Sequence, residues 1–346
     1  MSKEVTLFEE NRKKLIKKAV AVLGLVLIAI VAIVLVCMAI DKYKTEKYLE
    51  SYGMTALEVG AYEVDFGTYR CLYLTYRDEL KKEYTENGDT DTAALDKEIR
   101  SRISDDVRHM YAVISLAADH GYSLTSSDVI SVADTYIAEM KAYCESSDMD
   151  FEKTLEDGYM NEDIFTFLLR SRALNDVLNV ALVSDGGEIE DNDEKLLEIF
   201  NGDDMIRVLS VFIENDDGED VEANRALALE VVEKYKGGAD FNELIKKYSE
   251  DYYGDFYITR GEKIDVFDTA AFALDEGEIS DVVTSDDGFY VILRVGKDAG
   301  YIEDNFDTLK SQYQYVRYNE KIEARMNSLA VSESAYVKSL SYEEIE

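Results

Sequence analysis

Few residues of this chain could do covalent or metal chemistry. Its 346 residues include two histidines, His109 and His120, and three cysteines, Cys37, Cys71 and Cys144. Neither histidine has a cysteine partner at a metal-binding spacing, so we expect no metal site and no cofactor. Cys71 and Cys144 could form one disulfide in an oxidising compartment, but their spacing is equally consistent with two buried free thiols. Any site must therefore use other residue types.

One ordered motif lies in residues 253–295, which read YGDFYITRGEKIDVFDTAAFALDEGEISDVVTSDDGFYVILRV. The segment begins with a Gly-Asp pair, which is followed by a short strand-like run and by Arg-Gly. A helix pattern that starts with an aromatic residue comes next, and a strand pattern that starts with glycine ends the segment. The residues that make up this ordered pattern are Gly254, Asp255, Arg260, Gly261, Phe267, Ala270, Phe272, Leu274, Gly277, Glu278, Ser280 and Gly288. With these residues, the segment from about Ile206 to Lys297 resembles a parvulin-type peptidyl-prolyl isomerase domain.

The resemblance implies a pocket for a proline ring. It places Phe256 and Phe267 in the pocket wall and Lys263 where the family usually has methionine. In the first strand, Val211 takes a position at which the family usually has a histidine that faces the site. Two phenylalanines in a small domain are about as consistent with core packing as with pocket walls.

Isomerisation of an X–Pro bond requires neither a nucleophile nor a metal. The barrier to rotation about a peptide bond is about 18–20 kcal/mol, and an apolar cleft can disfavour the planar, charge-separated amide. The resemblance implies catalytic positions at Asp251 and Tyr290, where Tyr290 takes the place of a second histidine usual in the family. Without both histidines, isomerase activity can be weakened or lost.

The residues around this motif predict a small α/β unit. MIRVLSVFI (205–213) is β-branched and of strand length, and ANRALALEVVEKYKGG (223–238) and DFNELIKKYSED (240–251) are helix-like. A glycine-containing link and another helix follow, and DVVTS (281–285) and GFYVILRVG (288–296) read as a hairpin.

The rest of the chain reads as helical. Apolar residues recur three and four positions apart in residues 57–84, 95–111, 129–140, 160–182 and 305–329. A helix that returns after a compact insert is expected to pack on the first helical module. The predicted fold class is α+β, with a parvulin-like α/β domain inserted in a helical, chaperone-like body.

This layout is similar to exported foldases of the PrsA and SurA type, in which helical segments precede and follow a parvulin domain. The similarity covers roughly residues 57–340. The expected divisions are a cytoplasmic basic tail (1–18), a transmembrane signal anchor (19–40), a helical module (45–195), a parvulin-like domain (203–298) and a C-terminal helix (302–346).

Residues 19–40 form an apolar run of 22 residues without a charge. As a helix rising ~1.5 Å per residue it would span about 33 Å, enough to cross a bilayer. Basic residues at positions 12–18 precede it, so the N-terminus is predicted to be cytoplasmic and the bulk of the chain extracytoplasmic. Cleavage after the run, or lipid attachment at Cys37, are alternatives to an uncleaved single-pass anchor.

The composition excludes one class of partner. The formal net charge is −36, and residues 1–40 are net basic, so the acidity belongs to the predicted extracytoplasmic part. Binding of nucleic acid through a basic face is therefore not expected.

Three functions fit these observations. The first is a membrane-anchored isomerase that assists folding of exported proteins, with unfolded or nascent chains as its partners. The second is a holdase chaperone on the same fold, with a catalytically degenerate parvulin unit. The third is an envelope or secretion scaffold.

Overall fold

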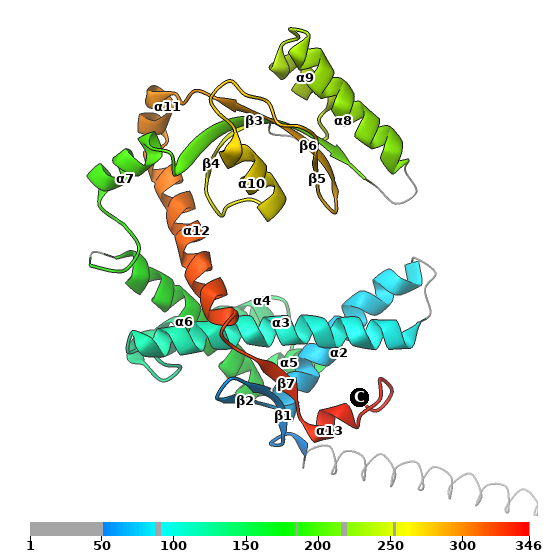
Figure 1. Ribbon diagram of the computed structural model, residues 1–346. Helices are drawn as coiled ribbons and strands as arrows, with labels where there is room; N and C mark the ends of the chain where they lie inside the picture. Colours follow the sequence, from blue (N-terminus) through cyan, green and yellow to red (C-terminus); the bar gives the residue numbers. More distant parts are fainter. Residues whose placement is uncertain (1–50, 87–90, 185, 216–219, 252–253, 346) are drawn as a thin grey trace, which may run out of the picture. The chain divides into compact units, whose positions relative to one another are not determined.

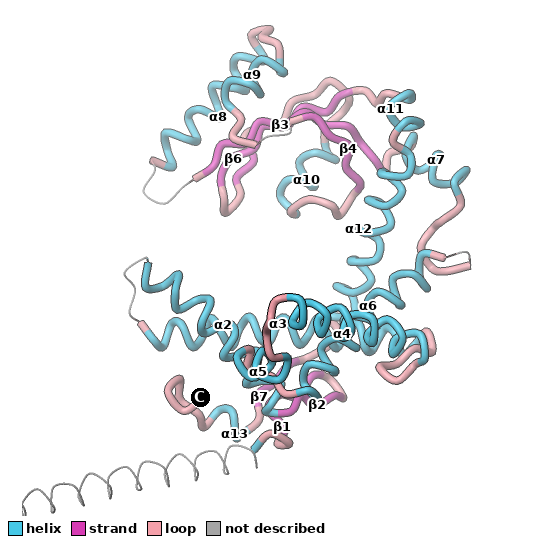
Figure 2. The backbone as a smooth tube through the Cα atoms, turned by 180° about the vertical axis from the view of Figure 1, so that it is seen from behind, coloured by secondary structure: helices cyan, strands magenta, loops and turns pink. Residues whose placement is uncertain are grey.

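The computed structural model describes residues 51–86, 91–184, 186–215, 220–251 and 254–345 (Figures 1 and 2). The predicted basic tail and transmembrane anchor lie outside these ranges. Within them, no helix is both long and apolar enough to cross a membrane. The described residues contain helices and two antiparallel sheets, which confirms the α+β class for this part of the chain.

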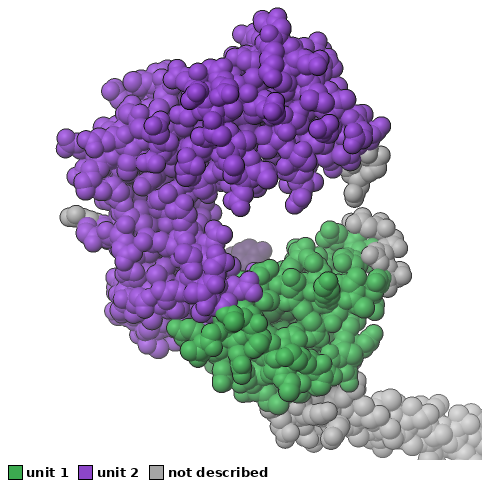
Figure 3. Space-filling view, viewed as in Figure 1, with its two compact units in different colours: residues 1–105, 147–165, 330–346 green, residues 106–146, 166–329 purple. Residues whose placement is uncertain are grey.

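The described residues form two compact units, which Figure 3 colours separately. The first unit holds residues 51–105, 147–165 and 330–346, and the second holds residues 106–146 and 166–329. The second unit therefore contains helical segments together with the α/β residues. Helices α3 (Thr92–Asp119) and α6 (Glu162–Val183) contribute residues to both units.

The first unit is built around a three-stranded sheet of order β2-β1-β7. Its elements are β1 (Thr55–Val59), β2 (Tyr62–Asp65), α2 (Phe66–Glu86), part of α3, α5 (Phe151–Asp157), β7 (Val331–Glu333) and α13 (Ala335–Lys338). Strand β7 pairs antiparallel with β1, so the C-terminal segment completes a sheet that begins about 270 residues earlier.

The prediction of one helix across residues 57–84 is wrong at its start. Residues up to Asp65 form the β1–β2 hairpin, and helix α2 begins at Phe66. Gly60 adopts a φ of 59°, which a tight turn between the strands requires. Leu57, Val59 and Val64 are buried in this sheet. Leu57 and Val59 are two positions apart, as in a strand, but strands of five and four residues are too short to stand out beside the helical period that follows.

The second unit contains a four-stranded antiparallel sheet of order β4-β3-β6-β5. Its strands are β3 (Met205–Glu214), β4 (Asp255–Thr259), β5 (Val283–Thr284) and β6 (Gly288–Val295), and its helices are α8 (Val221–Lys236), α9 (Phe241–Tyr248) and α10 (Asp265–Ala273). Asp220 and Asp240 cap the N-termini of α8 and α9 by accepting backbone N–H bonds. Helices α8 and α9 cover one face of the sheet and α10 covers the other (Figure 2).

The remaining helices of the second unit are α4 (Ser127–Ser146), α7 (Asp193–Asn201), α11 (Ala299–Asp304) and α12 (Phe306–Met326). Figure 1 shows α12 running past α7. Near its start, Leu309 of α12 packs with Leu196 of α7 and Tyr257 of β4. Farther along, Tyr318 and Ile322 of α12 are buried in a cluster with residues of α3, α4 and α6. We name this second group the helical cluster.

Buried tyrosines make the stability of the protein sensitive to alkaline pH. Burial raises the pKa values of Tyr69, Tyr73 and Tyr318 above the ordinary tyrosine value of about 10. The unfolded chain therefore loses these protons first as the pH rises. Their contribution to stability is complete below about pH 10 and falls above it, by up to about 1.4 kcal/mol per pH unit for each tyrosine.

Urea unfolding of wild type and Tyr318→Phe at pH 8 to 11.5 checks this expectation. The substitution removes the hydroxyl that donates to Asn175 Oδ1 at 2.7 Å, so it lowers stability at pH 8. We expect the difference between the two proteins to shrink above pH 10, because the phenylalanine variant has one fewer tyrosine to ionise. A difference that stays constant across this range would contradict the expectation.

Candidate parvulin site

The two faces of β3 belong to different cores. Ile206 and Val208 pack with Phe267 and Ala271 of α10. Leu209, Val211 and Ile213 pack instead with helices α8 and α9. Successive side chains of a strand point to opposite faces, so even-numbered positions of β3 face α10 and odd-numbered positions face α8 and α9.

Four aromatic rings form a continuous group on the α10 side of the sheet, and we name this group the aromatic face. The Tyr290 ring stacks on Phe212, with centroids 4.5 Å apart, and meets Phe267 edge-on at 5.2 Å. Phe256 continues the row, with its centroid 6.2 Å from that of Phe267. Phe267 is only 3% exposed, whereas the other three rings are half-buried. A row of partly open rings suits the apolar ring of a proline.

The structure brings most of the predicted site residues to this face. Phe256, Phe267 and Tyr290 are members of it, and the Lys263 ammonium lies 4.8 Å from the centroid of Phe256. Burial raises the pKa of the Tyr290 hydroxyl, and the carboxylates of Asp251 and Asp287 raise it further. Tyr290 therefore keeps its proton at neutral pH and can donate a hydrogen bond, and Asp251 is near enough to act on it electrostatically.

Val211 does not belong to the aromatic face. Its side chain is fully buried in the opposite core, between the sheet and helices α8 and α9. The prediction that this position faces the site is wrong, because successive side chains of a strand point to opposite faces. Ser210 and Phe212 hold the positions of β3 that point toward α10, and Phe212 stacks on Tyr290. Apolar residues stand at both odd and even positions of β3, so the sequence carried no local signal for the side that faces α10.

Ser210 carries an unusual buried hydroxyl. Its side chain is 4% exposed, and its Oγ atom has no hydrogen-bond partner among the described residues. A buried polar group without a partner destabilises a fold, and removing the group relieves that cost. Ser210→Ala is therefore expected to leave the free energy of unfolding unchanged or raise it by up to about 1 kcal/mol.

A nearby serine supplies a matched control. Ser280 is 6% exposed, and its Oγ accepts the backbone N–H of Ile292 at 2.9 Å. Ser280→Ala leaves that buried N–H unpaired and is expected to cost about 1–2 kcal/mol. Urea denaturation of both variants measures the contrast. Equal losses would show that the Ser210 hydroxyl has a partner in solution.

The remaining chemistry-bearing residues lie elsewhere. His109 and His120 are on or just after α3, and His120 Nε2 is 3.6 Å from Glu188. Cys71 and Cys144 are both buried, and no disulfide joins them to each other. Within the described ranges, no group of three or more histidine, cysteine, aspartate or glutamate side chains is placed to hold a metal ion.

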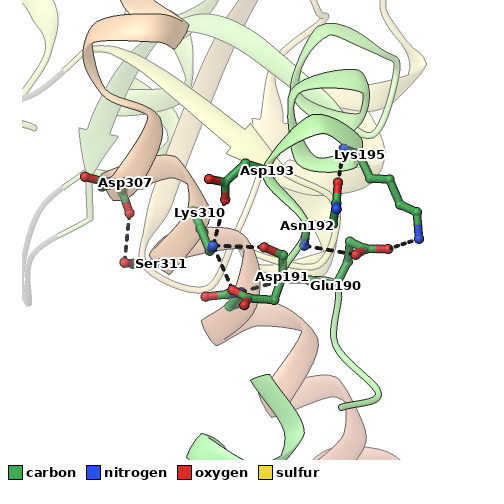
Figure 4. Close-up of polar contacts among 9 residues, drawn as sticks. Glu190, Asp191, Asn192, Asp193, Lys195, Asp307, Lys310 and Ser311 are labelled. Atoms are coloured by element: carbon green, nitrogen blue, oxygen red, sulfur yellow. Dashed lines mark hydrogen bonds and ion pairs between the residues drawn. The ribbon is translucent and has the colours of Figure 1, made fainter. Parts of the chain in front are cut away.

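A polar cavity of about 1090 Å³ lies between residues 186–195 and helix α12. Its cations are paired with its own carboxylates: Lys310 with Asp191 and Asp193, and Lys195 with Glu190 (Figure 4). Because these charges satisfy one another, they hold the loop to α12 and leave little to attract a ligand.

The chain is similar to several known proteins. Residues 194–297 match the family model described as a PPIC-type PPIase domain. The foldase protein PrsA of Oceanobacillus iheyensis is 30% identical over 154 residues, which cover 40% of this chain and 48% of that protein. PrsA of Bacillus subtilis is 26% identical over 235 residues, which cover 66% of this chain and 69% of that protein.

Among solved structures, the peptidylprolyl isomerase PrsA of Bacillus anthracis is similar at 18% identity and a TM-score of 0.38. That match covers 64% of this chain and 96% of the other. The match to the Oceanobacillus iheyensis relative spans about half of that protein's length. The family model and these two PrsA relatives support the identification of residues 194–297 as a parvulin-type domain like that of PrsA foldases.

Proposed function

We propose that the protein is a foldase that accelerates rotation about X–Pro bonds in unfolded polypeptides. The observation that carries this proposal is the aromatic face, whose four rings are in contact and of which three are partly open to solvent. A proline ring placed against these rings leaves water, and its amide then lies in a less polar environment.

The residues of the aromatic face support a mechanism without covalent chemistry. The planar amide is charge-separated, so an apolar environment destabilises it relative to the twisted transition state. Tyr290 stays protonated and can donate to the amide or to a neighbouring carbonyl of the substrate. Asp251 contributes a negative charge near Tyr290, and Lys263 lies at the edge of Phe256.

We also propose an extracytoplasmic location, with residues 19–40 as a membrane anchor. The support is the uncharged run of 22 residues preceded by basic side chains, together with the acidity of the rest of the chain. Unfolded or nascent exported proteins would then be the partners. The division into a helical module at 45–195, a parvulin-like domain at 203–298 and a C-terminal helix from 302 is part of the same proposal.

A holdase on the same fold is the second candidate, and a specific observation favours it. Ser210, Phe212 and Tyr290 of β3 and β6 stand on the α10 side of the sheet, and none of them is the histidine that the resemblance leads us to expect. Ser210 Oγ has no partner among the described residues, so it does not form the polar network that would replace the histidines.

One experiment separates the two candidates. The protein comprising residues 45–346 is tested in two assays. The first measures isomerisation of a proline-containing tetrapeptide, and the second measures aggregation of an unfolded client protein. Rate enhancement supports the isomerase. Suppressed aggregation without rate enhancement supports the holdase, and failure in both assays contradicts the foldase proposal.

A further inference from the structure

The loop from Arg260 to Lys263 joins β4 to α10 and borders the aromatic face. The Lys263 ammonium lies 4.8 Å from the ring centroid of Phe256. The Arg260 guanidinium lies 4.2 Å from the ring centroid of Phe272, which packs on the same core. The conformation of this loop therefore decides what a substrate meets at the edge of the aromatic face.

Helix α10 holds the loop from one side. The carboxylate of Asp268, which is 7% exposed, accepts the backbone N–H of Gly261 and, at 3.3 Å, that of Lys263. Gly261 has a φ of 85°, a left-handed conformation that favours glycine. A buried carboxylate that accepts two backbone N–H groups is a strong local anchor.

Helix α12 holds the loop from the other side. The guanidinium of Arg317 donates to the carbonyl oxygen of Arg260. Gln312 Nε2 donates to Glu262 Oε2 at 2.5 Å and to the carbonyl oxygen of Tyr257 at 3.0 Å. Glu320 of α12 also approaches Gly261, so closely that a Cβ at Gly261 would lie 2.7 Å from its Oε1 atom. Helix α12 therefore contacts three consecutive loop positions, 260 to 262.

The same helix is fixed in the helical cluster. Tyr318, the residue next to Arg317, is 3% exposed in that cluster, and its hydroxyl donates to Asn175 Oδ1 at 2.7 Å. Ile322 is 2% exposed in the same cluster. Lys310 fixes the start of α12 to residues 191 and 193 (Figure 4). Because α-helices are stiff over such distances, a shift of the helical cluster moves the Arg317 donor with it.

We propose that α12 couples the helical cluster to the aromatic face, and that Arg317 is a positioning residue for substrate binding there. This inference rests on the proposed function. Arg317 acts through the Arg260 carbonyl and keeps Lys263 over Phe256, so its loss changes how a proline peptide binds more than how fast a bound peptide is turned over.

Arg325 provides a matched control on the same helix. The side chains of Arg317 and Arg325 are both 26% exposed. Arg325 donates to Ser115 Oγ at 2.6 Å and to Asp119, and these contacts lie within the second unit without involving the loop. Arg325→Gln therefore reports the effect of losing a similar arginine from α12 without releasing the loop.

The test uses residues 45–346 as wild type, Arg317→Gln, Arg317→Lys and Arg325→Gln. For each protein we would measure kcat and KM on a proline tetrapeptide and the Kd of the same peptide by fluorescence anisotropy. The amide NMR signals of residues 260–263 report the conformation of the loop. We expect Arg317→Gln to raise KM and Kd about fivefold, with kcat within about twofold of wild type. Arg317→Lys should restore most of the affinity, and Arg325→Gln should leave KM and Kd unchanged.

Two results would overturn the proposal. One is an equal change in Kd for Arg317→Gln and Arg325→Gln, which would indicate a general loss of packing. The other is an unchanged set of amide signals at residues 260–263 in Arg317→Gln. If the wild type shows no turnover, the isomerase proposal fails, but the Kd values and the amide signals still decide whether α12 positions the loop.

Discussion

Phe267→Ala is expected to abolish measurable isomerase activity and to lower the free energy of unfolding by about 3–5 kcal/mol. Phe267 is 3% exposed and stands between Phe256 and Tyr290 in the aromatic face. Its removal leaves a cavity beneath the surface on which a proline ring would rest. The two neighbouring rings then lose their common contact, so the apolar environment of the amide is lost with it.

Phe241→Ala is the matched control for this experiment. Phe241 is also 3% exposed, but it packs in the core between the sheet and helices α8 and α9. A similar loss of stability, about 3–5 kcal/mol, is expected for this variant. Because its cavity lies on the other side of the sheet, the folded fraction should keep its isomerase rate.

A gentler substitution keeps the test informative if the alanine variant does not fold. Phe267→Leu retains most of the apolar volume but loses the ring contacts, and is expected to cost about 1–2 kcal/mol. The measurements are urea unfolding and the isomerisation rate per folded molecule. Equal rates in the Phe267 and Phe241 variants would remove the aromatic face as the site of catalysis.

Arg100→Ala is expected to destabilise the first unit by about 3 kcal/mol. The guanidinium is 18% exposed and bonds Asp96 at 2.8 Å and Glu333 at 2.9 Å. It also donates to the carbonyl oxygen of Leu340 at 3.0 Å. Without it, the mostly buried carboxylates of Asp96 and Glu333 lose their cation, and the C-terminal segment with β7 loses its attachment to α3.

Arg102 offers the comparison, since it lies on the same helix. It bonds Glu98 at 2.9 Å with the same spacing of four residues, but the two side chains are 40% and 44% exposed. Exposed ion pairs contribute little, so Arg102→Ala is expected to change stability by no more than about 0.5 kcal/mol. Chemical denaturation followed by far-UV circular dichroism measures both. A similar loss for both variants would mean that burial of the Arg100 network does not matter.

The sequence predicted most helices because burial of one face imposes a period that is visible locally. Residues 95–111 and 129–140 lie within α3 and α4, and residues 160–182 coincide with α6 except for the first two positions. The ordered motif at 253–295 likewise predicted the strands and helix of the parvulin-type unit. Of its aromatic residues, Phe267 contacts both Phe256 and Tyr290, because the motif specifies which residues stand on β4, α10 and β6.

Contacts between distant segments could not be predicted in this way. The pairing of β7 with β1 depends on residues about 270 positions apart, and neither strand is long enough to show its own period. The choice of Val211 instead of Ser210 is a shift of one residue along β3. In a strand, a shift of one residue exchanges the two faces of the sheet, and only the register with β4 and β6 shows which face meets α10.

The sequence alone therefore determined the class of domain and which side chains could form an apolar site, since these depend on residue type and on short-range spacing. The tertiary structure decided which of those side chains meet. It placed Phe212 in the aromatic face and Ser210 on the same side of the sheet, and it brought Arg317 of α12 to the loop beside Lys263. Such contacts arise from the packing of whole elements, because the free energy of burial depends on the partners that each face finds.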